Sequence, residues 1–368
     1  MNTASLINTN NPNRLHFLDG LRGIAILLVV LFHAYSDTWD EFLPYHYQYH
    51  GFFIFKYGSY GVQLFFLISG FVISMSLEKC NSFGDFMFRR WLRLFPAMLI
   101  VSLIILITAP LLSARPMGIP NFRDLIPGLT FVEPEAFRTI FNNHQKLIEG
   151  CFWTLFVEVK FYIVAGLLYF SIGQKKMIAA LIIMFLISTI FGLMQAHIPS
   201  ELEVRLGTIL HYLNYQHYGW FAAGALFYKC YSLKNVSCFL MGLLIALLSA
   251  RALDGFLSIS MIFATTLVLI FAVSIFNPML QELLSNKFLG LIGFISYPLY
   301  LIHENAMISI IVQLHHQYDW IPLFFLPLLP ISGLIFVAWI ITRYLEPFVR
   351  QFIKNLLLLL RNSPVRVV

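Results

Sequence analysis

Residues 17–34 read FLDGLRGIAILLVVLFHA, and no charged residue stands between Arg22 and His33. An apolar run approaching the roughly 20 residues that span a bilayer core predicts a membrane helix. Similar runs recur along the chain, separated by polar or Pro/Gly-bearing breaks. They predict an all-α polytopic membrane protein, a bundle of about ten transmembrane helices. The expected helices cover residues 21–36, 59–78, 94–113, 152–172, 177–196, 207–228, 236–252, 255–276, 288–313 and 321–345.

The composition excludes a soluble globular chain. Hydrophobic residues make up 59% of the 368 positions and charged residues only 11%, where about a quarter is usual. A globular fold cannot bury that much apolar surface, whereas lipid solvates helices that are apolar on all sides. The net charge of +6 fits cytoplasmic loops rich in Lys and Arg. Because no basic stretch carries interleaved aromatics, we expect no nucleic-acid partner.

The distribution of positive charge predicts the orientation in the bilayer. With the N-terminus inside, sixteen Lys and Arg residues fall in inner segments and seven in outer ones, while Lys160 lies within a helix. Both termini are therefore expected in the cytoplasm. The N-terminal segment lacks the pattern of a cleaved signal peptide. We expect one transmembrane domain over 1–368, with tails at 1–16 and 346–368, and an outer loop at 114–150 that is either a cap or passive.

The first helix carries two ionisable groups that lipid disfavours. Arg22 and His33 are eleven residues apart, so they share one face and are separated by about 16 Å along the axis. An arginine at the inner rim suits a phosphate-bearing ligand, and a deeper histidine suits a general base. The alternative is that Arg22 snorkels and His33 bonds a neighbouring carbonyl.

The next two helices carry a small step and a basic segment. In the second helix, Ser69 and Gly70 form a step at which backbones can approach closely, so packing is the favoured role. The segment FRRWLRLFP follows at the inner side, with Pro96 suiting a helix start. Its residues Arg89, Arg90 and Arg93 serve either as a positive anchor or as a phosphate cradle on the same side as Arg22.

A polar stripe follows the fourth helix, FWTLFVEVKFYIVAG. Thr154, Glu158 and Tyr162 are spaced i, i+4, i+8 and share one face. A buried carboxylate must be protonated or paired, and Glu158 lies at about the depth of His33 along its helix. Pairing of the two would stabilise an imidazolium; the alternative is a structural lock. Lys160 points to the opposite side of the helix.

The ninth helix, GFISYPLYLIHENA, carries a second histidine and acid. Ser296, Tyr300, His303 and Glu304 follow i, i+4, i+7, i+8 on one face. We expect them to bind an acceptor hydroxyl, and helix–helix hydrogen bonding is the alternative. Other histidines lie in outer loops without an acidic or cysteine cluster, so no metal site is expected.

Six segments together resemble the acyltransferase-3 family of membrane O-acyltransferases. They are LDGLRGIA followed by His33, FFLISGFVIS, RRWLRLFP, FWTLFVEVKFY, ISYPLYLIHE and LEPF, in family order from residue 17 to about 348. The resemblance implies a ten-helix bundle and transfer from cytoplasmic acyl-CoA to a hydroxyl of an extracytoplasmic or membrane-linked glycan. It also implies roles for Arg22, His33, Arg90, Arg93 and Glu158. Lys160 departs from the pattern, because an uncharged polar residue is expected there.

These observations predict an acyltransferase with His33 and Glu158 as catalytic residues. The donor-binding set is Arg22, Arg89, Arg90 and Arg93, and the acceptor-binding or pocket-lining set is Asp19, Ser69, Trp153, Tyr162, Tyr300, His303 and Glu304. The expected co-substrate is acyl-CoA, by default acetyl-CoA, with no permanently bound cofactor. The expected partners are a carbohydrate acceptor and the lipid bilayer, in a bacterial inner membrane. The alternative function is a secondary transporter, although no repeat with broken helices supports it.

Overall fold

The computed structural model describes residues 15–141, 145–195, 207, 209, 210, 212–254 and 258–362. Every regular element in these residues is helical, as the apolar runs predict. The chain divides into two compact units. The first is Met1–Thr38, Tyr47–Met87 and Trp153–Phe294, and the second is Trp39–His46, Phe88–Phe152 and Ile295–Val368.

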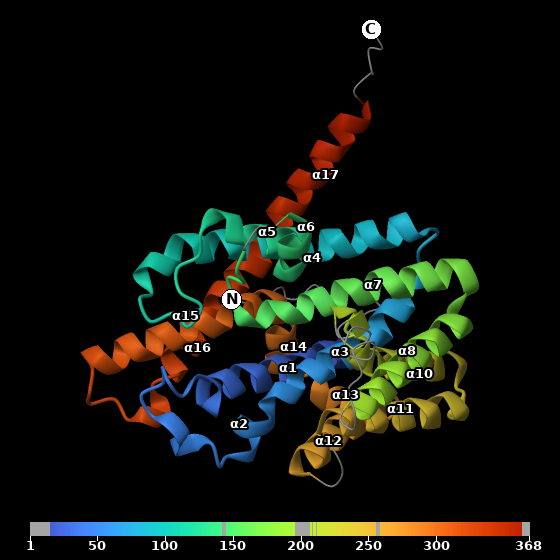
Figure 1. Ribbon diagram of the computed structural model, residues 1–368, viewed down its shortest axis with the longest axis horizontal. Coiled ribbons are helices and arrows are strands. Elements are labelled where there is room, and N and C mark those ends of the chain that lie inside the picture. The colour runs from blue at the N-terminus through green and yellow to red at the C-terminus, as the bar shows by residue number, and fades with distance from the viewer. Residues whose placement is uncertain are drawn as a thin grey trace. The chain divides into compact units, whose positions relative to one another are not determined.

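The first unit holds most of the helices (Figure 1). They are α1 (His16–Tyr35), α2 (Phe53–Tyr57), α3 (Gly61–Leu77), α7 (Trp153–Ile172), α8 (Gln174–Gln195), α10 (Tyr218–Leu233), α11 (Val236–Asp254), α12 (Ile259–Ser274), α13 (Pro278–Leu284) and α14 (Lys287–Phe294). Helix α3 packs against α1, α7 and α10, and α10 also packs against α8 and α11. Helices α3 and α10 together therefore connect the other helices of this unit.

Glycines set the closest helix crossings of the first unit. A Cβ on Gly20 would lie 1.9 Å from the Leu284 carbonyl oxygen, and one on Gly293 would lie 1.8 Å from the Asp19 carbonyl oxygen. The glycines of LDGLRG thus allow α1 to meet α13 and α14 at backbone distance. A Cβ on Gly70 would lie 2.0 Å from the Phe221 carbonyl oxygen of α10. The prediction that the Ser69–Gly70 step serves close packing is confirmed.

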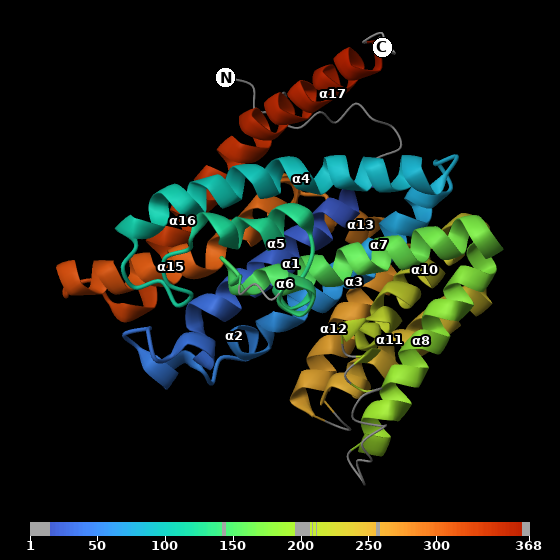
Figure 2. The same cartoon turned by 45° about the horizontal axis from the view of Figure 1, so that its top comes forward.

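The second unit contains the outer loop and the C-terminal helices. Its elements are α5 (Leu125–Thr130), α6 (Pro134–Phe141), α15 (Ser296–Gln317), α16 (Leu328–Ile340), a π-helical turn (Ile341–Leu345) and α17 (Glu346–Asn362). Helix α4 (Phe83–Thr108) contributes residues to both units. Helices α15 and α16 run side by side (Figure 2). The segment expected as an outer loop is thus partly helical.

The predicted start of the third helix is wrong. Pro96 lies inside α4, which begins thirteen residues earlier at Phe83. An internal proline removes only one backbone donor, and arginine is a good helix former, so the basic segment continues the helix. The Tyr297 hydroxyl donates to the Leu94 carbonyl oxygen at 3.1 Å, which adds a tertiary hydrogen bond two residues before the proline.

Several other boundaries also differ. Leu253 and Asp254, which separate the helices expected at 236–252 and 255–276 as either a tight hairpin or a misread boundary, belong to α11. Residues 255–257 lie outside the described part. The single helix expected at 288–313 is broken at Ile295 into α14 and α15. The helix expected at 321–345 begins at Leu328, and helical structure continues beyond 345 through the π-helical turn into α17. The helix expected at 207–228 has a wrong start, because α10 begins at Tyr218 after a 3-10 turn at Tyr215–His217. Residues 208 and 211 and both chain ends (1–14 and 363–368) lie outside the described residues.

The described helices make this a multi-pass chain. Six of them are long and apolar enough to cross a membrane, or up to eight if each of two broken pairs counts as one span. One of these pairs, α12 and α13, bends by 111°. Helix α10 has 16 residues and the apolar part of α11 is Val236–Ala252, both short for a bilayer core. The expected count of ten and the cytoplasmic termini stay predictions.

Candidate active site

The carboxylate of Glu158 is held by two hydroxyl groups. Glu158 Oε1 accepts hydrogen bonds from Ser69 Oγ at 2.7 Å and from Tyr162 OH at 2.5 Å. Ser69 comes from α3, and Tyr162 follows Glu158 by one turn of α7, as the i, i+4 stripe predicts. The two hydroxyl groups fix the position of the carboxylate between α3 and α7. Three residues predicted for the site are thereby brought together.

His33 lies in the last turn of α1, which is a single helix from His16 to Tyr35. Its Nδ1 is 3.0 Å from the Val29 carbonyl oxygen, one turn earlier. A ring nitrogen beside a carbonyl must carry the proton, so Nε2 holds the lone pair in the neutral ring. The carbonyl contact that the structural alternative requires is present, and it also fixes the tautomer that a general base needs. The pairing of His33 with Glu158 stays a prediction.

Arg22 and Asp19 form an ion pair at the start of α1. Arg22 Nη1 lies 3.1 Å from Asp19 Oδ1, and their side chains are 25% and 10% exposed. A partly exposed pair of this kind contributes little to stability, but it fixes the direction of the guanidinium. Asp19 therefore orients Arg22.

Lys160 is turned away from Glu158, as predicted. Its ammonium donates to the Tyr212 carbonyl oxygen and to Asn214 Oδ1, the latter at 2.9 Å. It also lies 4.2 Å from the centroid of the Tyr212 ring. Lys160 thus ties α7 to the segment before α10, so its charge belongs to a structural contact rather than to the Glu158 group.

The basic segment of α4 presents its charges at a surface. Arg89 and Arg93 are exposed and Arg90 is half-buried. The charge of Arg93 acts on Glu346, which also pairs with Arg350 at 3.4 Å. The basic segment of α4 therefore lies close enough to the LEPF segment for the two to interact electrostatically within the second unit. Arg22 belongs to the first unit, so a phosphate site shared by all four arginines stays a prediction.

The polar face of α15 contacts the outer loop. Glu304 Oε2 accepts from the Cys151 backbone N–H at 2.6 Å, and Tyr300 OH donates to the Cys151 carbonyl oxygen at 3.3 Å. His303, which is fully buried, has Nδ1 2.8 Å from the Tyr300 carbonyl oxygen. These side chains form hydrogen bonds with backbone atoms of Cys151 and of α15 itself. The alternative predicted for them was hydrogen bonding between two helices, and here the segment before α7 takes the place of the second helix. Binding of an acceptor hydroxyl by Tyr300, His303 and Glu304 stays a prediction.

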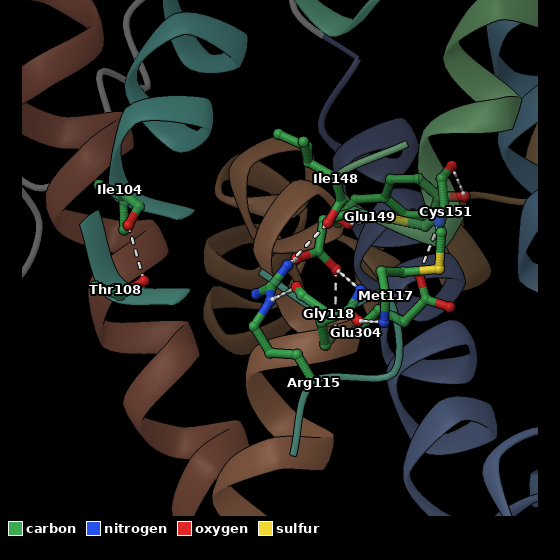
Figure 3. A network of polar contacts seen from close by, with 11 residues as sticks. Ile104, Thr108, Arg115, Met117, Gly118, Ile148, Glu149, Cys151 and Glu304 are labelled. Carbon is green, nitrogen blue, oxygen red and sulfur yellow. Dashed lines mark hydrogen bonds and ion pairs between the residues drawn. The ribbon is translucent and has the colours of Figure 1, made fainter. Parts of the chain in front are cut away.

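An ion pair that sequence reasoning missed lies beside Glu304 (Figure 3). Arg115 Nη2 is 3.0 Å from Glu149 Oε1, and both side chains are almost completely buried, at 1% and 0% exposure. Glu149 Oε2 accepts from the backbone N–H and the amide of Asn305, at 3.0 and 2.6 Å. Burial raises the pKa of Glu149 to about 7, although the Arg115 charge opposes the rise. The run His303-Glu304-Asn305 in an apolar helix is the one sequence signal for this network.

The loop is attached to α15 over several turns. Asn305 Oδ1 accepts from the Met117 N–H at 2.8 Å, and Ser309 Oγ accepts from the Ala114 N–H at 3.2 Å. Gln313 Nε2 donates to the Leu111 carbonyl oxygen at 2.9 Å. With the Glu149 ion pair, these bonds attach both ends of the expected outer loop to α15 within the second unit. Whether the loop is a cap or a passive connection stays a prediction.

An aromatic cluster surrounds Trp153 at the start of α7. The His217 ring is centred 5.4 Å from the Trp153 ring and 5.4 Å from the Phe66 ring. Trp153 is 40% exposed although its neighbours are buried. The ring of Trp153 is therefore partly accessible, and its role as a pocket-lining residue stays a prediction. Among the described residues no group of three or more His, Cys, Asp or Glu could hold a metal ion.

The apolar helices and their buried polar groups define a multi-pass membrane protein. The model of the family described as an acyltransferase domain matches residues 15–343, so the chain belongs to the acyltransferase-3 family and is an acyltransferase. It is similar to a protein of Shigella phage Sf6 named O-acetyl transferase, with 26% identity over 231 residues, which cover 61% of this chain and 67% of that protein. No solved structure matches the chain.

Proposed function

We propose that this acyltransferase moves an acetyl group from cytoplasmic acetyl-CoA to a hydroxyl of an extracytoplasmic or lipid-linked glycan. The observation that carries the proposal is α1, a single helix that holds Arg22 and His33 eleven residues apart on one face. The similarity to a protein named O-acetyl transferase supports acetyl as the group transferred. The family match is the reason for preferring an enzyme over a transporter.

His33 acts as the general base. Because Nδ1 is engaged with the Val29 carbonyl, Nε2 removes the proton of the acceptor hydroxyl. The oxygen attacks the thioester carbonyl, the carbon–sulfur bond breaks, and the coenzyme A thiolate takes the proton back from the imidazolium. The products are the ester and the free thiol. A positioned base of this kind is worth about 10²–10⁴ in rate.

Glu158 stabilises the imidazolium through its charge, while Ser69 and Tyr162 hold the carboxylate in place. Arg22, oriented by Asp19, and the α4 arginines bind the phosphates of coenzyme A at the inner face. The excess of positive charge in the inner segments supports this orientation. The enzyme then acts in a bacterial inner membrane, with the donor and the acceptor entering from opposite sides.

The test is release of free thiol from acetyl-CoA by the purified full chain with membrane glycans as acceptor. Wild type and His33→Ala are compared with His316→Ala, an exposed histidine at the end of α15 that serves as the control. Release should fall at least about 100-fold in His33→Ala and persist in the control. Equal release by wild type and His33→Ala would exclude His33 as the base.

A further inference from the structure

The last helical run of the second unit is too long for a single upright crossing of a bilayer. It extends from Leu323 to Leu359, which is 37 residues, or about 55 Å against a hydrocarbon core of about 30 Å. Residues 323–342 contain no charged side chain and match that core, with a length of about 30 Å as a helix. Charged residues begin at Arg343, so α17 begins where the hydrocarbon core ends.

Helix α17 has an apolar side that is exposed in this structure. Successive helical residues are about 100° apart, so an arc of about 80° holds Phe348, Phe352, Leu356 and Leu359. Their side chains are 72%, 60%, 46% and 68% exposed. Among the described elements, only the π-helical turn Ile341–Leu345 packs extensively against α17. Contact of so much apolar surface with water is costly, so this side requires a partner.

The opposite side of α17 is basic. Arg350 and Lys354 follow one another at i, i+4, and each lies about 160° from Phe352 around the helix axis. Lys354 is exposed. On the border between the two sides, the Gln351 amide donates to Asn355 Oδ1 at 2.9 Å. An apolar side, a basic side and a polar border are the features of a helix that lies in the interface between lipid and water.

A second copy of the chain is the competing partner for the apolar side. Paired helices use a narrow apolar stripe that is sustained over at least about three heptads. Helix α17 has 17 residues, which is little more than about two heptads. Val349 and Ile353 widen its apolar arc to about 140°, and a face of that width suits lipid better than a single seam. The bilayer is also adjacent, because residues 323–342 have the length and composition to cross it.

We propose that α17 lies along the bilayer surface, with its apolar side among the lipid tails and its basic side towards the phosphates of anionic lipids. Arg350 is paired with Glu346 at 3.4 Å, so Lys354 is the main contact for a phosphate. The π-helical turn before α17 is an interruption of the kind at which helices change direction. The proposal gives the segment expected as a tail the role of a surface anchor, and it does not depend on the acyl transfer.

Spin labels on single cysteines of the full chain test the orientation of α17. The background is Cys238→Ser, because the other three cysteines are buried. Nitroxide labels are placed by Phe352→Cys and Leu356→Cys on the apolar side and by Lys354→Cys on the basic side. The protein is reconstituted in nanodiscs that contain phosphatidylglycerol. Oxygen concentrates among the lipid tails and a water-soluble nickel chelate does not, so the ratio of the two accessibilities reports the depth of each label.

The accessibility ratio should alternate along α17 with the helical period of about 3.6 residues. The labels of Phe352→Cys and Leu356→Cys should favour oxygen, and that of Lys354→Cys should favour the nickel chelate. Leu358→Cys is the matched control, because Leu358 is apolar and 56% exposed but follows Lys354 at i+4 on the basic side. Its label should favour the nickel chelate as well.

Three other outcomes would each overturn the proposal. Access of the nickel chelate to every label would mean that α17 extends into water. A ratio that changes steadily along the helix, without alternation, would mean that α17 continues the membrane crossing. Exclusion of both reagents from the apolar side, with spin–spin broadening between copies, would mean that a second copy of the chain covers it.

The preference for anionic lipid is measured with the Leu356→Cys label in a Phe352→Ser background, which weakens the apolar anchor. One basic residue near an anionic surface favours the bound state about fivefold. Replacing phosphatidylglycerol with phosphatidylcholine should therefore lower the ratio of bound to unbound α17 about fivefold. Lys354→Gln should remove this dependence, whereas Lys175→Gln should retain it, because Lys175 is an exposed residue of α8. Equal ratios in the two lipids with Lys354 present would overturn the choice of anionic lipid as the partner.

Discussion

Replacing Arg115 with Met should destabilise the second unit strongly. Arg115 is 4% exposed and donates to Glu149, to the Ile148 carbonyl and to the Gly118 carbonyl, at 3.0, 2.8 and 3.1 Å. Removing one partner of a buried ion pair costs about 3–5 kcal/mol. Each orphaned acceptor would add about 1–3 kcal/mol if the costs were independent. The costs are not independent, because all three acceptors bond to the same arginine side chain. We therefore expect Arg115→Met to lower the free energy of unfolding by about 4 kcal/mol in total.

The assay is unfolding by titration of sodium dodecyl sulfate into dodecylmaltoside micelles, followed by far-UV circular dichroism at pH 8. At that pH Glu149 is ionised, because its pKa is about 7. In a Glu149→Gln background the same Arg115→Met change leaves no charge behind, so its cost should fall by about 2 kcal/mol.

Arg138→Met is the control, since the Arg138–Glu135 pair is 55% and 52% exposed and its loss should change stability by under about 0.5 kcal/mol. Equal costs of Arg115→Met in the wild-type and Glu149→Gln backgrounds would refute the reasoning. A cost of Arg115→Met no larger than that of the control would refute it too.

Three further predictions follow from the same contacts. Gly70→Ala should cost about 1–3 kcal/mol in the same titration, because its Cβ would lie 2.0 Å from the Phe221 carbonyl oxygen, whereas Gly84→Ala meets nothing within 4 Å and should not. Stability should fall by up to about 3 kcal/mol as the pH rises from about 4.5 to about 7, because the folded chain holds the Glu149 proton more tightly; Glu149→Gln should flatten the profile. Glu158→Gln should lower kcat about 100-fold with little change in the KM for acetyl-CoA, and an unchanged kcat would remove Glu158 from the mechanism.

The sequence predicts the helices that are bounded by clear breaks. Helices α1, α3, α7, α8, α11 and α12 begin and end within about five residues of the expected spans. The predicted boundaries are wrong where a helix continues beyond the expected edge of the membrane. The sequence pattern places the arginines of α4 outside a helix that begins near Pro96, yet arginine extends helices well. The last helix is expected to end at 345, but helical structure continues from the π-helical turn at Ile341–Leu345 into α17.

Local spacing predicts the site only within a helix. The i, i+4 spacing predicts the contact between Tyr162 and Glu158. The helical periodicity also predicts that Lys160 points away from Glu158, as it does. Contacts between distant residues are not encoded in that way. Ser69 and Glu158 form a hydrogen bond although they are 89 residues apart. Arg115 and Glu149 form an ion pair because the loop that carries them packs on α15. A charged residue in an apolar segment indicates that it has a partner, but which residue is that partner depends on how the helices pack.

Transfer of label from acetyl-CoA carrying a ¹³C-acetyl group to membrane glycans, read by mass spectrometry, tests the central claim most directly. The full chain is reconstituted in proteoliposomes with glycan acceptors, as wild type and as His33→Ala. We expect labelled O-acetyl groups on the glycan with wild type and a loss of at least about 100-fold in His33→Ala. Labelled glycan at the wild-type level in His33→Ala, or release of thiol without any label in the glycan, would contradict the account.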